Sequence, residues 1–282
     1  MSKIDLHIHT NCSDGKYSPA EIVKQSAASG LTIIAITDHD TVAGIAPALE
    51  AARIFPRLKV IPGVEISTET NTGEIHLLGY YVNYTDQNLQ TILERMRNTR
   101  LYRAQSMIAR LRNLGIYIDW QRVQKIAGSG AIGRPHIAQA MLEKGYITTF
   151  REAFGKYIGR DGPAYVEREK ITPVEAVQLI LKAGGLPVLA HPTTVNDPET
   201  AIVELKEVGL AGIETYYDNY TLEEIGKLVA MAEKYDLIAT GGSDYHGVDP
   251  TNESALGGVN VPDIVAVSLF ALVEKSGSRV PR

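Results

Sequence analysis

The sequence contains a single cysteine, Cys12, so no internal disulfide can form and a reducing compartment is expected. It also lacks any stretch of eighteen uninterrupted apolar residues, which predicts that no helix spans a membrane. The first ten residues, MSKIDLHIHT, carry no apolar signal-peptide core. These three absences together predict a protein of the cytoplasm.

No excess of positive charge is present either. Lys and Arg number 28 against 33 Asp and Glu, which gives a formal net charge of −5. This balance argues against a protein that coats duplex DNA, but it leaves room for a local basic pocket that binds one phosphorylated substrate. Nothing in the sequence indicates an obligate protein partner. The length of 282 residues suits one large domain, or one domain with an insertion.

Seven apolar, β-rich segments alternate with helical patterns, which predicts parallel βα units. Three helical patterns begin with a capping box, and two of these carry proline at the first helical position. Recurrent units of this kind favour either a barrel or a doubly wound sheet. The expected strands are 4–9, 32–36, 59–66, 74–80, 186–190, 212–215 and 237–240, and the expected caps are Ser18, Thr172 and Thr221.

The rhythm changes between residues 85 and 160, where apolar residues recur at helical spacing without an intervening strand. We predict a small helical insertion over 85–160, carried by a larger domain made of 1–84 and 161–282. The arginines of its first part are interpreted most simply as a solvated helix surface; they are Arg95, Arg97, Arg100, Arg103, Arg110 and Arg112.

Two histidines near the amino terminus provide the first chemical signal. His7 and His9 lie two positions apart on a predicted strand, so both side chains leave the same face. Two imidazoles this close suit a shared metal ion, and a hydrogen-bonded histidine pair is the alternative. Asp14 follows in a Ser-Asp-Gly segment, where an ordinary turn aspartate is the alternative to a functional one.

Further acids and histidines stand at or beside the other apolar strands, where parallel α/β proteins place their sites. Glu65 is the most telling, because a carboxylate in so apolar a strand is costly unless a cation compensates it. Gly241 and Gly242 allow close backbone approach before the last pair. Oxygen and imidazole donors together suit Mn, Fe or Zn, whereas Cys12 is a bystander. The set comprises His39 in TDHD, Glu65, His76, His191 in AHP, and Asp244 with His246 in GSDYH.

In order along the chain, DLHIHT with Asp14, TDHD, PGVE, a following histidine, AHP and GSDYH resemble the polymerase and histidinol phosphatase (PHP) family. The resemblance runs from Met1 to Gly258 and implies an α/β fold, a distorted (β/α)7 TIM-like barrel. It further implies three divalent metal ions, with Mn first and Fe or Zn as alternatives. The implied ligand sets are His7, His9, Glu65 and Asp244 for one ion, Glu65, His76 and His191 for the second, and Asp14, His39 and His246 for the third.

Motifs of the insertion are similar to the branch of that family that removes phosphate from nucleotides, namely IGRPH at 132–136, YIGR at 157–160 and PAY at 163–165. The branch includes 3′,5′-bisphosphate nucleotidases and enzymes that trim short RNA from the 5′ end, so the insertion is expected to cap the substrate. The resemblance implies substrate binding by Asp14, Arg134, Pro135, His136 and Arg160, and catalytic roles for His191, His136 and Arg134.

Arg134 has a physical case beside the resemblance. Pro135 suits the first turn of a helix, which places Arg134 at its amino end, and both a guanidinium group and a helix N-terminus favour phosphate. Pairing of Arg134 with a neighbouring acid is the alternative.

These inferences predict a metal-dependent phosphoesterase that hydrolyses phosphate monoesters of nucleotides, either 3′,5′-bisphosphates or short RNA 5′ ends, through attack of a metal-bound hydroxide. A histidinol-phosphatase-like or other small-molecule phosphatase is the first alternative. A metal-binding regulatory barrel without enzymatic activity is the second.

Overall fold

The computed structural model describes residues 3–70, 73–128, 132–167, 171–248 and 254–276. The chain divides into two compact units, one formed by Met1–Ile92 with Lys170–Arg282 and the other by Leu93–Glu169. The predicted insertion was 85–160, whereas the second unit begins inside the long helix α3 (Gln87–Asn113). None of the helices in the described ranges is long and apolar enough to cross a membrane. A cytoplasmic location stays a prediction.

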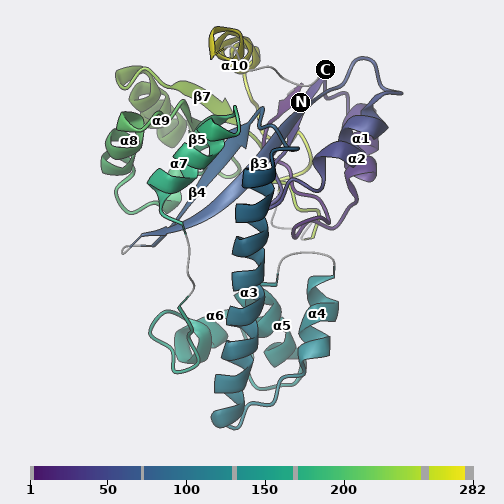
Figure 1. The fold of residues 1–282 in the computed structure, drawn as a ribbon, viewed down its shortest axis with the longest axis vertical. Helices are drawn as coiled ribbons and strands as arrows, with labels where there is room; N and C mark the ends of the chain where they lie inside the picture. Colours follow the sequence, from purple (N-terminus) through teal and green to yellow (C-terminus); the bar gives the residue numbers. More distant parts are fainter. Residues whose placement is uncertain (1–2, 71–72, 129–131, 168–170, 249–253, 277–282) are drawn as a thin grey trace. The chain divides into compact units, whose positions relative to one another are not determined.

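The first unit is a seven-stranded sheet whose strands follow one another in chain order, β1 to β7 (Figure 1). The sheet curls until its edges meet, since the Leu6 amide donates to the Gly241 carbonyl at 3.2 Å and Ile8 bridges Tyr245 in parallel. This closure confirms the predicted distorted barrel. Its strands are β1 Ile4–Asp5, β2 Ile33–Ile36, β3 Lys59–Thr70, β4 Gly73–Tyr80, β5 Leu186–Leu189, β6 Gly212–Tyr216 and β7 Ile238–Gly241.

Strand β4 departs from the expected parallel arrangement. It runs antiparallel to both β3 and β5, whereas the remaining neighbours pair in parallel. Only two positions separate β3 from β4, and a parallel crossover needs a dozen residues or more. The short connection therefore enforces a hairpin, and this is one source of the barrel's distortion.

Strand β1 is shorter than predicted. The expected strand was 4–9, but regular pairing covers only Ile4–Asp5, and Ile8 contributes one isolated bridge. Beyond Asp5 the Leu6 and His9 amides still donate to the backbone carbonyls of Gly241 and Tyr245. The other two amides donate to side chains, Ile8 to Thr37 Oγ1 at 3.0 Å and His7 to Asp5 Oδ1 at 3.4 Å. Specific polar contacts therefore hold the backbone at the positions of His7 and His9.

Helices cover the outside of the barrel and begin where the capping boxes predicted. Ser18, Thr172 and Thr221 each accept from the amide three residues on, and the Glu at that position reaches back to the cap. Gly30 takes a left-handed backbone just after the first of these helices and ends it. The helices of this unit are α1 Pro19–Ala28, α2 Ile45–Ala52, α7 Pro173–Lys182, α8 Pro198–Glu207, α9 Leu222–Lys234 and α10 Asp263–Ser276, with a short 3₁₀ turn at Pro192–Thr194.

The second unit is helical and has a hydrophobic core of its own. Met107 and Leu111 of α3 pack there with Val123, Ile137 and Met141, all of them fully buried. Its elements after α3 are α4 Trp120–Ala127, α5 Arg134–Glu143, α6 Phe150–Ala153 and a π-helical turn at Phe154–Ile158. The helical character predicted for this stretch is therefore present in the structure.

Candidate metal centre

Two histidines from the chain after β1 meet two acids from distant segments. His7 and His9 are fully buried, and their Nε2 atoms lie 3.3 and 3.2 Å from Glu65 Oε2. The same two nitrogens lie 3.2 and 3.0 Å from Asp244 Oδ1, in the loop after β7. The four side chains offer ligand atoms within 4.8 Å of one another. The first implied ligand set therefore converges in space.

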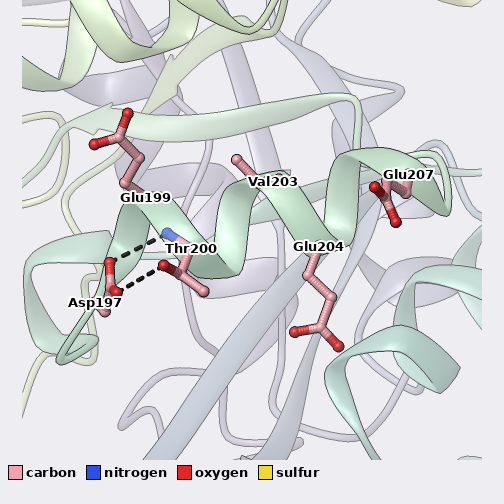
Figure 2. Close-up of a pocket in the computed structure, with 6 residues that line it drawn as sticks. All are labelled: Asp197, Glu199, Thr200, Val203, Glu204 and Glu207. Carbon is pink, nitrogen blue, oxygen red and sulfur yellow. Dashed lines mark hydrogen bonds between the residues drawn. The ribbon is translucent and has the colours of Figure 1, made fainter.

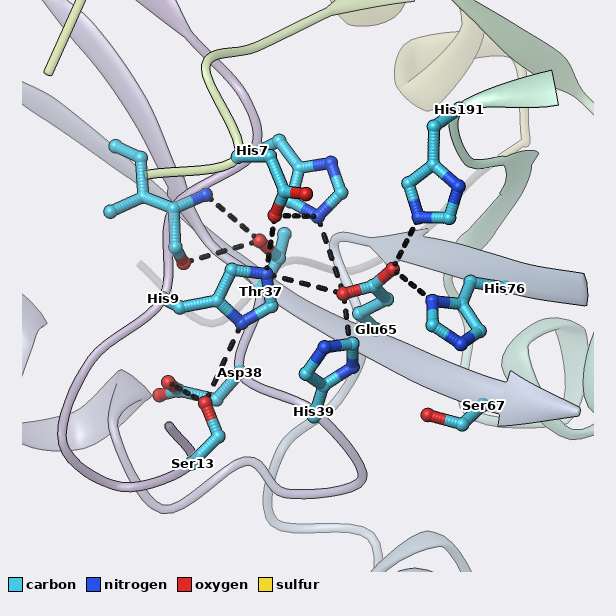
Figure 3. A network of polar contacts seen from close by, with 12 residues as sticks. His7, His9, Ser13, Thr37, Asp38, His39, Glu65, Ser67, His76 and His191 are labelled. Atoms are coloured by element: carbon cyan, nitrogen blue, oxygen red, sulfur yellow. Dashed lines mark hydrogen bonds and ion pairs between the residues drawn. The ribbon is translucent and has the colours of Figure 1, made fainter. Parts of the chain in front are cut away.

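Glu65, on β3, turns its other oxygen toward a second pair of histidines. Oε1 lies 2.9 Å from His76 Nδ1 and 3.1 Å from His191 Nε2, and Figure 3 shows these imidazoles around the one carboxylate. The two rings meet edge to face with centroids 5.1 Å apart. The two oxygens of the Glu65 carboxylate therefore face different histidines.

A third group of donors lies on the far side of His9. Asp14 Oδ1 lies 3.4 Å from His246 Nε2 and 3.6 Å from His9 Nδ1, and Asp14 Oδ2 lies 3.8 Å from His39 Nε2. His39 also faces Glu65, whose Oε2 is 3.0 Å from its Nδ1. His39 therefore contacts Asp14 of the third group and also the Glu65 oxygen that faces His7 and His9, whereas the resemblance assigned it to the third group alone.

The electrostatics of the cluster show how strongly these groups depend on a compensating charge. Burial opposes the charged form of His9, but its contacts with Asp244 and Glu65 raise its pKa to about 10. Burial lowers the pKa of His39 to about 4, against the attraction of Glu65 and Asp14. Burial alone would raise the pKa of Glu65, but the surrounding histidines hold the pKa of this carboxyl group well below its usual range. Burial and the opposite charges of neighbouring groups therefore act against each other at these residues.

Several donor atoms of the cluster are arranged to bind a cation and do not form hydrogen bonds with one another. Among the described residues, His9 Nε2, His39 Nδ1, Asp14 Oδ1 and Asp244 Oδ1 are buried within ion-pair distance of other donors of the cluster, but none of these contacts has hydrogen-bond geometry. Buried polar atoms are rarely left in this state, and convergent nitrogen and oxygen atoms are the donors that divalent first-row metals take. The residues present therefore suit divalent metal ions. Cys12 belongs to none of the three groups, as expected of a bystander.

The backbone near the ligands is held in unusual conformations. His191 has φ 27° and Asp244 has φ 52°, both in the left-handed region that favours glycine. Such strain is found where surrounding structure imposes it, commonly at functional sites. A Cβ on Gly242 would lie 2.4 Å from the His7 amide nitrogen, so this glycine allows the close approach predicted for it.

Buried aspartates beside the ligands hold the loops in place, and sequence reasoning did not single them out. Asp5 accepts from the Ser243 amide and hydroxyl at 2.9 and 2.6 Å, and thereby ties the chain after β7 to β1. Asp38 accepts from the Thr10 amide at 2.6 Å and the Ser13 hydroxyl at 2.8 Å, which fixes the loop leading to Asp14. Their signal was present, since each is an acid directly beside a motif histidine or strand.

Sequence analysis also did not identify two residues of this region, Glu214 within β6 and Tyr217 directly after it. The Tyr217 hydroxyl donates to Asp244 Oδ2 at 2.7 Å, which leaves Oδ1 facing the histidines. Glu214 is fully buried and lies 2.9 Å from His7 Nδ1. The signal for Glu214 was the one that revealed Glu65, namely a carboxylate within an apolar strand.

The predicted substrate residues of the insertion lie in the second unit. Arg134 is the first residue of α5, Pro135 stands in its first turn, and the Arg134 guanidinium lies over the Phe154 ring at 5.5 Å. His136 Nδ1 accepts from the Gly133 amide at 2.9 Å. Arg160 follows the π-helical turn and is exposed.

A cavity on α8 is unsuited to a phosphate ester. Its lining includes four carboxylates, as Figure 2 shows, and these would repel an anion. It contains none of the clustered histidines. The lining residues are Asp197, Glu199, Thr200, Val203, Glu204 and Glu207.

Comparison with known families and proteins agrees with this geometry. Residues 5–159 match the model of the PHP domain. The 3′,5′-nucleoside bisphosphate phosphatase of Chromobacterium violaceum is 32% identical over 253 residues, covering 87% of this chain and 88% of that protein. The 5′-3′ exoribonuclease Rnm of Escherichia coli is 34% identical, covering 86% and 84%. The phosphoribosyl 1,2-cyclic phosphate 1,2-diphosphodiesterase of Eggerthella lenta is 30% identical, covering 86% and 94%.

A solved structure is similar along nearly the whole chain. A Bifidobacterium adolescentis protein, assigned as a metal-dependent phosphoesterase, superposes with a TM-score of 0.81 at 29% sequence identity, and the match covers 95% of each chain. The likeness therefore includes both the barrel and the helical unit.

Proposed function

Because the chain belongs to the PHP domain family and is a hydrolase, we propose that it removes phosphate from nucleotides, either 3′,5′-bisphosphates or the 5′ ends of short RNA. The proposal includes three divalent metal ions held by the three donor groups, with Mn as the first candidate and Fe or Zn as alternatives. The observation that carries it is the convergence of five histidines on the single carboxylate of Glu65. His7, His9 and His39 face Oε2, whereas His76 and His191 face Oε1.

The charge balance of the cluster supports an anionic substrate. Three divalent ions would bring +6, while the carboxylates of Asp14, Glu65 and Asp244 return −3, so the loaded site is positive within an acidic protein. When bound, such ions polarise the phosphoryl oxygens and lower the pKa of water toward neutrality, which supplies the nucleophile. His39, His76 and Asp14 are partly exposed, so the donors are open to solvent on one side.

Residues of this chain would then position the ester and move the proton. We assign phosphate binding to Arg134 with Pro135, His136, Arg160 and Asp14. His136 Nδ1 accepts a backbone N–H, so the proton of the neutral ring sits on Nε2, where it can be donated to a phosphate oxygen. His191 or His136 would assist in protonating the leaving oxygen, with a water held by the metal ions as the alternative proton source, and Arg134 would neutralise charge on the nonbridging oxygens.

Loss of a ligand tests the metal-dependent mechanism. His9→Ala and Asp244→Asn should each lower phosphate release from a nucleoside 3′,5′-bisphosphate by at least about 100-fold, because the first removes a nitrogen donor and the second removes the negative charge of a ligand. Asp197→Asn, a cap of α8 outside the cluster, is the matched control and should retain wild-type activity. Circular dichroism of the variants checks that the fold is kept. Wild-type turnover in folded His9→Ala protein would reject the mechanism.

The role of Arg134 is tested by the split between kcat and KM. Arg134→Ala should raise KM by about 10-fold or more, the weight of a charge-assisted hydrogen bond to phosphate. Arg112→Ala, on the exposed surface of α3, is the control. Unchanged KM in Arg134→Ala would remove this residue from the site.

A panel of substrates separates the alternatives. A nucleotide-specific enzyme should prefer nucleoside 3′,5′-bisphosphates or 5′-phosphorylated short RNA, whereas a histidinol-phosphatase-like enzyme should prefer small phosphomonoesters. The Eggerthella lenta relative adds a cyclic phosphodiester to the panel. A metal-binding regulatory barrel would release no phosphate from any of them in the presence of Mn²⁺, Fe²⁺ or Zn²⁺.

A further inference from the structure

Glu214 is a fully buried carboxylate on β6 that belongs to none of the three donor groups. Each of its oxygens is engaged by a different metal-ligand candidate. Oε1 lies 2.9 Å from His7 Nδ1, and Oε2 accepts the backbone N–H of His191 at 2.8 Å. One side chain thus contacts a ligand on each side of the Glu65 carboxylate.

The burial of Glu214 requires an explanation. A buried carboxylate is costly unless it is paired and hydrogen-bonded, and within the described part of the chain its ion-pair partner is His7. Truncation of Glu214 to an apolar side chain would leave His7 Nδ1 and the His191 amide without this acceptor. The buried acid is therefore matched to these two groups in particular.

At His7 the carboxylate determines which ring nitrogen carries the proton. Glu214 can only accept, so Nδ1 must donate to it, and Nε2 of the neutral ring is left as a lone pair. That Nε2 is the atom that faces Glu65 and Asp244 at 3.3 and 3.2 Å. A histidine can bind a metal only through an unprotonated nitrogen, and a carboxylate on its other nitrogen fixes this tautomer.

At His191 the same carboxylate holds the backbone. The residue has φ 27° and ψ 61°, a conformation that non-glycine residues rarely adopt. The hydrogen bond from its amide to Glu214 stabilises this conformation, which directs Nε2 to within 3.1 Å of Glu65 Oε1.

We propose that Glu214 is a positioning residue that sets the tautomer of His7 and the backbone of His191 together, and so couples the ligands of two neighbouring metal ions. The proposal rests on the metal centre of the proposed function and does not depend on the substrate.

Glu214→Gln provides a near-isosteric test. If the new amide keeps its oxygen on the His191 N–H, its NH₂ group faces His7 Nδ1 and forces the proton onto Nε2, the ligating atom. If it turns around, the His191 contact is lost instead. Zn²⁺ affinity, measured by competition with a chromogenic chelator, should therefore fall by about 10- to 100-fold.

Thr215→Val is the matched control, because it removes a buried hydroxyl from the next position of β6, where Thr215 donates to the Thr240 carbonyl. It should bind Zn²⁺ like the wild type.

A second measurement reads the tautomer directly. In ¹⁵N-histidine-labelled, Zn²⁺-loaded wild-type protein, NMR should show His7 with a proton on Nδ1 and none on Nε2, and this signature should be lost in Glu214→Gln. Wild-type Zn²⁺ affinity in folded Glu214→Gln, or equal weakening in Thr215→Val, would overturn the proposal. Should Glu214→Gln fail to fold, Glu214→Asp decides, because the shorter acid keeps the charge but cannot span both partners and should also weaken Zn²⁺ binding. Failure of the proposed function, by contrast, would appear as normal Zn²⁺ binding without phosphate release.

Discussion

At the scale of single residues, one steric constraint beside the donors falls on a position with no side chain. A Cβ on Gly242 would meet the His7 amide nitrogen at 2.4 Å and His7 Cβ at 2.5 Å. Gly242→Ala should therefore destabilise the protein by about 1–3 kcal/mol, because the chain segment carrying His7 must move. Gly226, exposed within α9, has no atom within 4 Å of such a Cβ. Gly226→Ala should stabilise by about 0.5–1 kcal/mol. Urea unfolding of both variants, monitored by circular dichroism, measures the difference, and equal effects would contradict the account.

The site residues that the sequence predicted are those whose chemistry conflicts with their surroundings. Glu65 and His191 stand out because ionisable groups end or interrupt apolar strands, and the structure brings them together. Glu214 carried the same signal and was missed, since only the folded chain shows that it contacts His7. The position of His39 between two donor groups likewise depends on distances that no sequence spacing encodes.

At the scale of elements, the capping boxes are the local signals that translate most directly into stability. Thr172→Ala should cost about 1 kcal/mol, because the amide at the start of α7 loses its acceptor. Thr91→Ala, on the exposed surface of α3, is the control and should be neutral or slightly stabilising. Chemical unfolding compares the two variants. A loss of stability in Thr91→Ala as large as that in Thr172→Ala would contradict the role of the cap.

The sequence predicts a helix or strand well where neighbouring residues determine it, and less well where the element depends on residues distant in the sequence. Caps and most strand positions follow from neighbouring residues, as at Ser18 and Thr221. The direction of β4 and the short extent of β1 depend on what lies beside them, namely β3 across a tight connection and the Thr37 side chain. Apolar alternation reports a strand but not its direction.

At the scale of the whole molecule, bound metal ions should stabilise the fold. Ions that bind the native cluster and not the unfolded chain add about 2.7 kcal/mol per site at a hundredfold excess over Kd. Exhaustive chelation should therefore lower the thermal unfolding midpoint, and Mn²⁺ should restore it. Asp244→Asn should diminish the shift, whereas Asp197→Asn should keep it. Identical midpoints before and after chelation, by calorimetry, would argue against a metal centre of this size.

The barrel brings together donors that lie as far apart in the sequence as His7 and His246. The most direct test is a crystal structure of the Mn²⁺-loaded protein with anomalous difference maps recorded at the manganese edge. The account predicts anomalous peaks within coordination distance of His9, Glu65 and Asp244, with Glu65 between two of them. Maps without peaks at this cluster, or with peaks only elsewhere, would contradict it.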